Sequence, residues 1–177
     1  MLDRRRVPAH TTSAVLYFVV MKPVLGLAFA HTHFDSLLAA IPLTRTMQIA
    51  LRDYDGDSLT LAAPLAPNVN DKGCAFGGSL ASVATLAGWG LIALKLKSLG
   101  LDCDVYVQDS TIRYLAPVWG DLIATATLAN AESWDAFLAS LTTRGRGRLR
   151  IACCVPGAEE TNACTLDARF VAIGNKR

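Results

Sequence analysis

Two consecutive glycines, Gly77 and Gly78, stand at the start of the longest apolar segment in the chain. The first turn of a helix leaves backbone N–H groups without partners and carries the positive end of the helix dipole. Glycine has no Cβ, so a ligand can approach this backbone closely. The pair therefore suits an oxyanion hole, which stabilises the negative oxygen that forms when a carbonyl is attacked. The alternative is structural, with the two glycines allowing the loop to pack tightly against the helix.

The element that would position this pair is a helix predicted over residues 77–99. Apolar side chains cover nearly its whole circumference, and its first charged residue is Lys95, a pattern typical of a buried helix. Gly88 and Gly90 lie in its interior, where glycine is unfavourable, and indicate close approach by a neighbouring element. Gly100 provides a C-terminal stop.

Strand patterns lie on both sides of this helix. Before it we expect a helix over 34–43, capped by Asp35 or Ser36 and ended by Pro42, and a hairpin with strands 47–54 and 58–63 around Asp55-Gly56-Asp57. After it we expect strands over 104–114, 121–130, 145–155 and 161–173, with a short helix or irregular bridge over 133–141 capped by Ser133. A sheet wrapped around one helix buries the apolar faces of both, so we predict a single α+β domain.

Residues 1–33 differ in composition and are assigned to an N-terminal extension. A basic start precedes an apolar run over 14–21, and Ala28-Phe29-Ala30 resembles a signal-peptidase site, but Lys22-Pro23 interrupts the run. Two interpretations stay open: a cleaved signal peptide, or an extension upstream of a start at Met21. No membrane span is expected, because a span needs about 20 uninterrupted apolar residues.

The overall composition excludes several classes of protein. Of the 177 residues 52% are hydrophobic and 18% are charged, which excludes an intrinsically disordered chain. Lys and Arg number 17 against 15 Asp and Glu, a balance that gives no indication of a nucleic-acid partner. The five cysteines form no C-x-x-C pair, so we expect free thiols in the reducing cytoplasm. His31 and His33 have no third ligand nearby, and we expect neither a metal nor a cofactor.

Two motifs and the helix between them resemble a known family. Asn70-Asp71-Lys72-Gly73-Cys74-Ala75-Phe76-Gly77-Gly78-Ser79 opens the helix, and Ile112-Arg113-Tyr114-Leu115-Ala116-Pro117-Val118-Trp119-Gly120-Asp121 follows one strand later. Over residues 34–177 the chain resembles the hotdog-fold thioesterases, most closely those similar to the hotdog domain of YiiD-type proteins. The resemblance implies a hotdog fold and a homodimer or dimer of dimers with its sites at the interface. It further implies hydrolysis of acyl-CoA or acyl-carrier-protein thioesters.

The resemblance also assigns roles around the helix. Gly77 and Gly78 take the oxyanion position, and relatives often carry histidine where this chain has Phe76. Asn70 stands where relatives position the attacking water or hold the loop; a turn-forming asparagine is the alternative. Thr85 stands where many relatives carry an Asp or Glu that acts as base or nucleophile. Its hydroxyl can orient a water but cannot act as a base near neutral pH, so a non-catalytic module that binds acyl thioesters or acyl carrier protein is the rival function.

Two further hydroxyl or carboxylate groups are candidates near this position. Ser82 lies close to Thr85 on the predicted helix and is assigned to the substrate-binding set with Phe76. A serine position of the family aligns with Val107, and Asp109 shares the parity of Val107 along the predicted strand. Asp109 is therefore a candidate base, with a surface carboxylate as the alternative.

Four arginines repeat at every second position: Arg144, Arg146, Arg148 and Arg150. On a strand they would share one face. They could bind the phosphates of coenzyme A or the acidic surface of an acyl carrier protein. The alternative is a solvated strand face. RNA is a further partner for an Arg-Gly run, but no aromatic residues interleave with these arginines.

Overall fold

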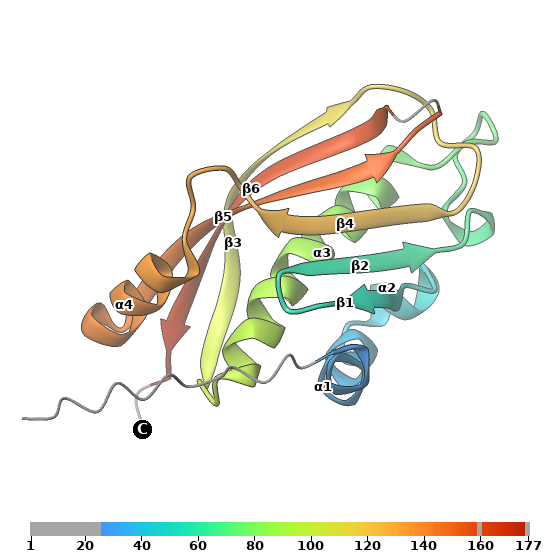
Figure 1. The fold of residues 1–177 in the computed structure, drawn as a ribbon. Coiled ribbons are helices and arrows are strands. Elements are labelled where there is room, and N and C mark those ends of the chain that lie inside the picture. The colour runs from blue at the N-terminus through green and yellow to red at the C-terminus, as the bar shows by residue number, and fades with distance from the viewer. Residues whose placement is uncertain (1–25, 159–160, 176–177) are drawn as a thin grey trace, which may run out of the picture.

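The computed structural model describes residues 26–158 and 161–175. Its centre is the helix α3 (Gly77–Ser98), around which six antiparallel strands form one sheet in the order β1-β2-β4-β5-β6-β3 (Figure 1). The strands are β1 (Ala50–Tyr54), β2 (Ser58–Ala63), β3 (Cys103–Tyr114), β4 (Leu122–Leu128), β5 (Arg146–Pro156) and β6 (Asn162–Gly174). The other helices are α1 (Leu27–Ala39), α2 (Pro42–Thr46), the 3-10 turn η1 (Ala66–Asn68) and α4 (Trp134–Arg144). The predicted α+β architecture is confirmed.

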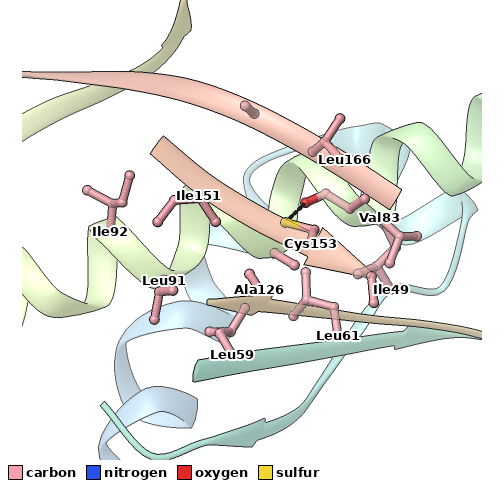
Figure 2. Close-up of a cluster of buried hydrophobic side chains, with 14 of the residues drawn as sticks. Ile49, Leu59, Leu61, Val83, Leu91, Ile92, Ala126, Ile151, Cys153 and Leu166 are labelled. Carbon is pink, nitrogen blue, oxygen red and sulfur yellow. Dashed lines mark hydrogen bonds between the residues drawn. The ribbon is translucent and has the colours of Figure 1, made fainter. Parts of the chain in front are cut away.

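The core lies between α3 and the face of the sheet that it covers, which we call the inner face. Val83 and Leu91 of α3 are fully buried among Leu59, Leu61 and Ile151 of the sheet (Figure 2). The thiol of Cys153 donates to the carbonyl oxygen of Ala84 at 3.2 Å, which ties β5 to the helix. Burial alternates along β5, so its odd-numbered residues lie on the inner face and its even-numbered residues face outward.

Two interior glycines let other elements approach α3 closely. A Cβ at Gly88 would lie 2.9 Å from the ring of Phe170, and one at Gly90 would lie 2.4 Å from the ring of Phe34. The predicted close approach is therefore confirmed at both positions. Within the described residues α3 is also the one helix with the length and apolar composition of a membrane span. Most of its apolar window is buried in the fold, as the core position requires.

The first helix begins at Leu27 rather than at residue 34. Ala30, Phe34 and Leu38 are its buried residues, spaced four apart on one face, so this helix packs into the core ahead of the predicted domain start. The predicted cap was wrong, because Asp35 and Ser36 lie inside the helix. The interpretations offered for residues 1–25 concern a segment that lies outside the described residues.

Pro42 and the two histidines of this region all lie in helices. Pro42 opens α2 at a first-turn position, where its missing N–H is no loss, and does not simply end a helix. His31 and His33 lie in α1, where residues two apart do not face each other, so they are not paired metal ligands. In the described part of the chain no three His, Cys, Asp or Glu side chains group as a metal site.

Two short-range predictions were confirmed. The hairpin turns at Gly56, whose φ of 97° suits glycine, and Asp55 Oδ1 accepts from the N–H groups of Asp57 and Ser58 at 2.9 and 2.6 Å. The segment after β4 is the helix α4, and Ser133 caps it by accepting from the N–H of Ala136 at 3.4 Å.

Candidate active site

The first turn of α3 presents unpaired backbone donors. The first helical hydrogen bond runs from the N–H of Leu80 to the carbonyl of Phe76 at 3.1 Å. The N–H groups of Gly77, Gly78 and Ser79 therefore have no partner among the described residues, and Phe76 at the N-cap provides no side-chain acceptor. No acidic residue occupies the first turn. Such a set of donors can accept an oxyanion, which is the role that the sequence predicts for the glycine pair.

Two aromatic rings flank the glycines. A Cβ at Gly78 would lie 2.3 Å from Cε1 of Phe76, and a Cβ at Gly77 would lie 3.4 Å from Cε1 of Tyr114. Both rings are about half exposed, so each is also open to a ligand. At Gly78 a Cβ would force the Phe76 ring to move, and because Phe76 joins the loop to α3, this is the tight packing of loop against helix that the structural alternative predicts. At Gly77 the distance to Tyr114 is that of an ordinary contact. The packing role and the chemical role of the pair are therefore compatible.

Tyr114 contributes a polar contact that sequence reasoning missed. Its hydroxyl donates to the carbonyl oxygen of Gly77 at 3.1 Å. Tyr114 and the four residues after it, with Ala75, Gly77 and Leu80, line a hollow of about 370 Å³ beside the helix start. The signal was present in the second motif, which contains Tyr114, but the pattern gave no indication of where the hydroxyl would point.

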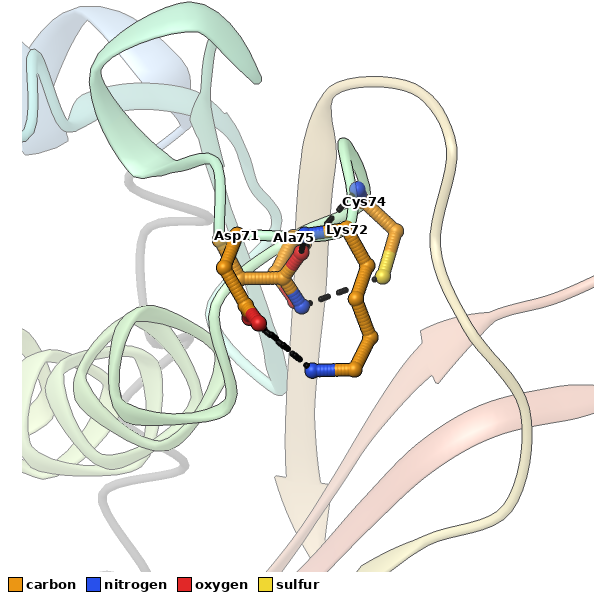
Figure 3. Close-up of polar contacts among 5 residues, drawn as sticks. Asp71, Lys72, Cys74 and Ala75 are labelled. Atoms are coloured by element: carbon orange, nitrogen blue, oxygen red, sulfur yellow. Dashed lines mark hydrogen bonds and ion pairs between the residues drawn. The ribbon is translucent and has the colours of Figure 1, made fainter.

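The side chain of Asn70 is fully engaged in the loop before α3. Its Oδ1 accepts from the N–H groups of Lys72 and Cys74 at 2.8 and 3.3 Å, and its Nδ2 donates to Cys74 Sγ at 3.2 Å and to the Ala75 carbonyl at 3.4 Å (Figure 3). These contacts favour holding the loop over positioning a water, for which they leave no donor or acceptor. The bond from the Lys72 N–H is also the turn that the alternative predicts for Asn70. The loop in turn fixes Phe76, whose N–H donates to the Asn68 carbonyl at 2.7 Å.

Ser82 and Thr85 line a second hollow, a groove of about 340 Å³ between α2 and α3. Its other lining residues are Ile41, Leu43, Thr44, Met47, Ala81 and Leu86. The Ser82 hydroxyl donates to the Gly78 carbonyl at 2.8 Å, so it is already satisfied. The Thr85 hydroxyl is half-buried and has no partner within the described ranges, so it is available to a water or a substrate. Two helical turns, about 10 Å of axis, separate Thr85 from Gly78.

Asp109 does not face this site. A β-bulge at Gln108 interrupts the pairing of β3 with β6, so that Val107 pairs with Phe170 but Asp109 pairs with the next residue along, Arg169. Phe170 is buried on the inner face, whereas Arg169 is on the outer face. Val107 and Asp109 therefore lie on opposite faces of the sheet, and the prediction from their shared parity was wrong. The extra residue at the bulge turns Asp109 away from α3 and turns Ser110 toward it.

The arginines also lie on the outer face. Arg146, Arg148 and Arg150 alternate with buried residues of β5 and share that face, as their spacing predicts. Arg144 was wrongly placed on the strand, because it is the last residue of α4. Arg148 Nε donates to Gln108 Oε1 at 2.9 Å, and Arg150 forms ion pairs with Asp167 and, at 3.9 Å, with Asp109. The fold thus does not bring these arginines to the start of α3.

Comparisons with known proteins agree with this architecture. Residues 33–174 match the family described as "Putative thioesterase (yiiD_Cterm)". A protein of unknown function from Chlorobaculum tepidum TLS is 27% identical, with a TM-score of 0.76 over 82% of this chain and 94% of that one. A structure described as a putative thioesterase from Shewanella oneidensis is 26% identical, with a TM-score of 0.71 over 82% and 98%.

A more distant structure shares the fold alone. The E. coli PaaI protein from the phenylacetic acid degradation operon is 17% identical, with a TM-score of 0.59 over 84% of this chain and 96% of that one. The antiparallel six-stranded sheet around a long central helix is the hotdog architecture of these thioesterase neighbours. The chain belongs to the hotdog-fold family of YiiD C-terminal-domain thioesterases.

Proposed function

We propose that this chain hydrolyses acyl thioesters of coenzyme A or of an acyl carrier protein. The observation that carries the proposal is the set of unpaired N–H groups at the start of α3, beside the hollow lined by Gly77, Leu80 and Tyr114. The thioester carbonyl oxygen binds these donors, water attacks the carbonyl carbon, and the negative charge that develops on oxygen is stabilised. In enzymes that have an oxyanion hole, one such donor stabilises the transition state by about 3–4 kcal/mol. The attacking water gives up one proton, which reaches the leaving sulfur directly or through solvent, and collapse of the intermediate breaks the C–S bond to release the thiol and the acid.

The polar group proposed to orient the attacking water is the Thr85 hydroxyl. It cannot act on a carbonyl bound at Gly78 of its own chain. A carbonyl oxygen at the Gly78 N–H lies about 3 Å beyond that nitrogen, on the side away from the helix body. Thr85 lies about 10 Å from Gly78 in the opposite direction along the axis. The site therefore needs a second contribution, and we propose that Thr85 of a second copy provides it.

An edge of the sheet supports pairing of two copies. In the described sheet β3 pairs with β6 alone, so its other edge is open. An open strand with exposed apolar residues is a template for pairing with another chain. On β3 and just after it, Val107 is 48% exposed and Leu115 is 59% exposed. We propose a homodimer that joins two sheets along β3; such dimers could pair again into a dimer of dimers.

A rival function rests on one observation. Thr85 is a hydroxyl and not a carboxylate, so the chain could bind acyl thioesters or acyl carrier protein without turnover. Thiol release from short, medium and long acyl-CoA substrates, with an acyl carrier protein as a further substrate, separates the two. Hydrolysis above the uncatalysed rate for any member supports the enzyme. Saturable binding by calorimetry with no thiol release across the whole panel would favour the binding module. The five free thiols favour a reducing cytoplasmic setting for either function.

A further inference from the structure

Tyr114 is held beside the glycine pair by the end of the sheet. It is the last residue of β3 and pairs with Cys164 of β6. Directly after it, the N–H groups of Leu115 and Ala116 both donate to the Ala163 carbonyl, at 2.8 and 3.1 Å. Its ring lies 3.4 Å from the position of a Cβ on Gly77. The backbone of Tyr114 is thus fixed, and its ring has a defined position against the start of α3.

The bulge in β3 is what brings Tyr114 to this side of the sheet. Ahead of the bulge, Val105 and Val107 face inward. Past Gln108 the alternation is reversed, so Ile112 and Tyr114 face inward, opposite the buried Leu166 and Cys164. With an uninterrupted strand Tyr114 would share the outer face with Tyr106. The same bulge that removes Asp109 from the inner face therefore adds the Tyr114 hydroxyl to it.

The hydroxyl of Tyr114 acts on the peptide that carries a candidate oxyanion donor. The carbonyl of Gly77 and the N–H of Gly78 belong to one planar trans peptide, so they point in opposite directions. A donor that fixes the carbonyl oxygen also fixes the direction of that N–H. Donation to the carbonyl polarises the amide, which strengthens its N–H as a donor. The contact of 3.1 Å between Tyr114 Oη and Gly77 O can therefore influence bonding at Gly78 without touching the substrate's carbonyl.

We propose that Tyr114 is a positioning residue for the oxyanion hole, acting through the Gly77–Gly78 peptide. The inference rests on the proposed thioester hydrolysis and names the group that orients one of its donors, the Gly78 N–H. It differs from a packing role, because the ring alone would provide the contact with Gly77. The hydroxyl is the part that the inference requires.

The test compares two tyrosines of the same strand. Tyr114→Phe removes the hydroxyl and keeps the ring, and Tyr106→Phe is a matched control, since both side chains are 53% exposed and the Tyr106 hydroxyl has no partner in the described residues. In thiol-release assays Tyr114→Phe should lower kcat about 5- to 10-fold with little change in KM, because the contact matters most when charge develops on oxygen. Tyr106→Phe should match the wild type. A Tyr114→Phe enzyme with wild-type kcat and unchanged melting temperature would overturn the inference.

A second measurement separates this inference from the proposed function. A phosphonate analogue of an acyl-CoA, with P(O)(O⁻)–CH₂ in place of the thioester C(O)–S, carries a negative tetrahedral oxygen like that of the intermediate and releases no thiol. Calorimetry should show a several-fold weaker Kd for Tyr114→Phe and a wild-type Kd for Tyr106→Phe. If the wild-type protein releases no thiol from any substrate, the proposed hydrolysis fails, and this binding comparison still decides the role of Tyr114. Equal Kd values for wild type and Tyr114→Phe would contradict that role.

Discussion

Asp109 and Arg150 meet on the outer face of the sheet, with 3.9 Å between the Asp109 carboxylate and the Arg150 guanidinium. Arg169 lies at the same distance from the other oxygen of Asp109. The carboxylate is half exposed and is separated from α3 by the sheet itself. Its surroundings are those of a surface ion-pair group, the alternative that the sequence left open.

Replacing Asp109 should therefore leave the chemistry intact. For Asp109→Asn we expect thiol release within about 2-fold of wild type, because the side chain faces away from the helix start. The melting temperature should change little, since exposed pairs of this kind contribute about 0–1 kcal/mol. A fall in kcat of tenfold or more, in protein with a wild-type melting curve, would show that Asp109 reaches the reacting atoms.

A site shared between two copies predicts complementation. Thr85→Val keeps the shape of the side chain and removes its hydroxyl, and kcat should fall about tenfold. Gly78→Val should be more severe, because it blocks the oxyanion donor. A dimer of one Gly78→Val chain and one Thr85→Val chain has one site with both residues intact and one with neither. Co-expressed, differently tagged chains purified as heterodimers should therefore recover about half of the wild-type rate. A heterodimer whose thiol-release rate is no greater than the mean of the rates of the two variant proteins would show that Gly78 and Thr85 of one site come from the same chain.

The protein should become less stable in alkaline solution because a buried thiol and a buried phenol, those of Cys153 and Tyr54, resist ionisation in the folded state. Burial raises the pKa of Cys153 to about 12, and it raises that of Tyr54, with nearby Asp57 and Asp55 adding to the effect, also to about 12. Above pH 9 the unfolded state loses the Cys153 proton while the folded state keeps it, so unfolding becomes more favourable. The free energy of unfolding, from urea titrations, should fall as pH rises from 9 toward 12. Cys153→Ala should remove up to about 1.4 kcal/mol per pH unit from that slope. If Cys153→Ala shows the same dependence of unfolding free energy on pH as the wild type, the raised pKa of Cys153 is contradicted.

The order of helices and strands was accessible from the sequence because hydrophobic periodicity and turn residues are local signals. The buried α3, the hairpin at Gly56 and the cap at Ser133 all follow from such signals. The start of α1 was missed because Ala30 and Phe34 are buried by tertiary packing and not by any local cap. No sequence rule assigned residues 27–33 to the core.

The site was less accessible because its decisive features are not local. Asp109 and Tyr114 exchanged faces relative to simple alternation through one extra residue at Gln108. A hint was available, since apolar residues occupy odd positions at Val105 and Val107 but an even position at Ile112. The contacts of Phe76 and Tyr114 with the glycines depend on how the loop and strand end meet the helix, which spacing alone does not determine.

The measurement that tests the central claim most directly is thiol release by Gly78→Val. A Cβ at position 78 would meet the Phe76 ring at 2.3 Å, so the side chain and the displaced ring would both crowd the unpaired N–H groups. Gly120→Val is the matched control, because a Cβ there has nothing within 4 Å. We expect Gly78→Val to lose about 10²-fold or more in kcat while its melting curve stays close to that of Gly120→Val, which should retain wild-type activity. Wild-type hydrolysis by well-folded Gly78→Val would show that the thioester carbonyl is not bound at the start of α3.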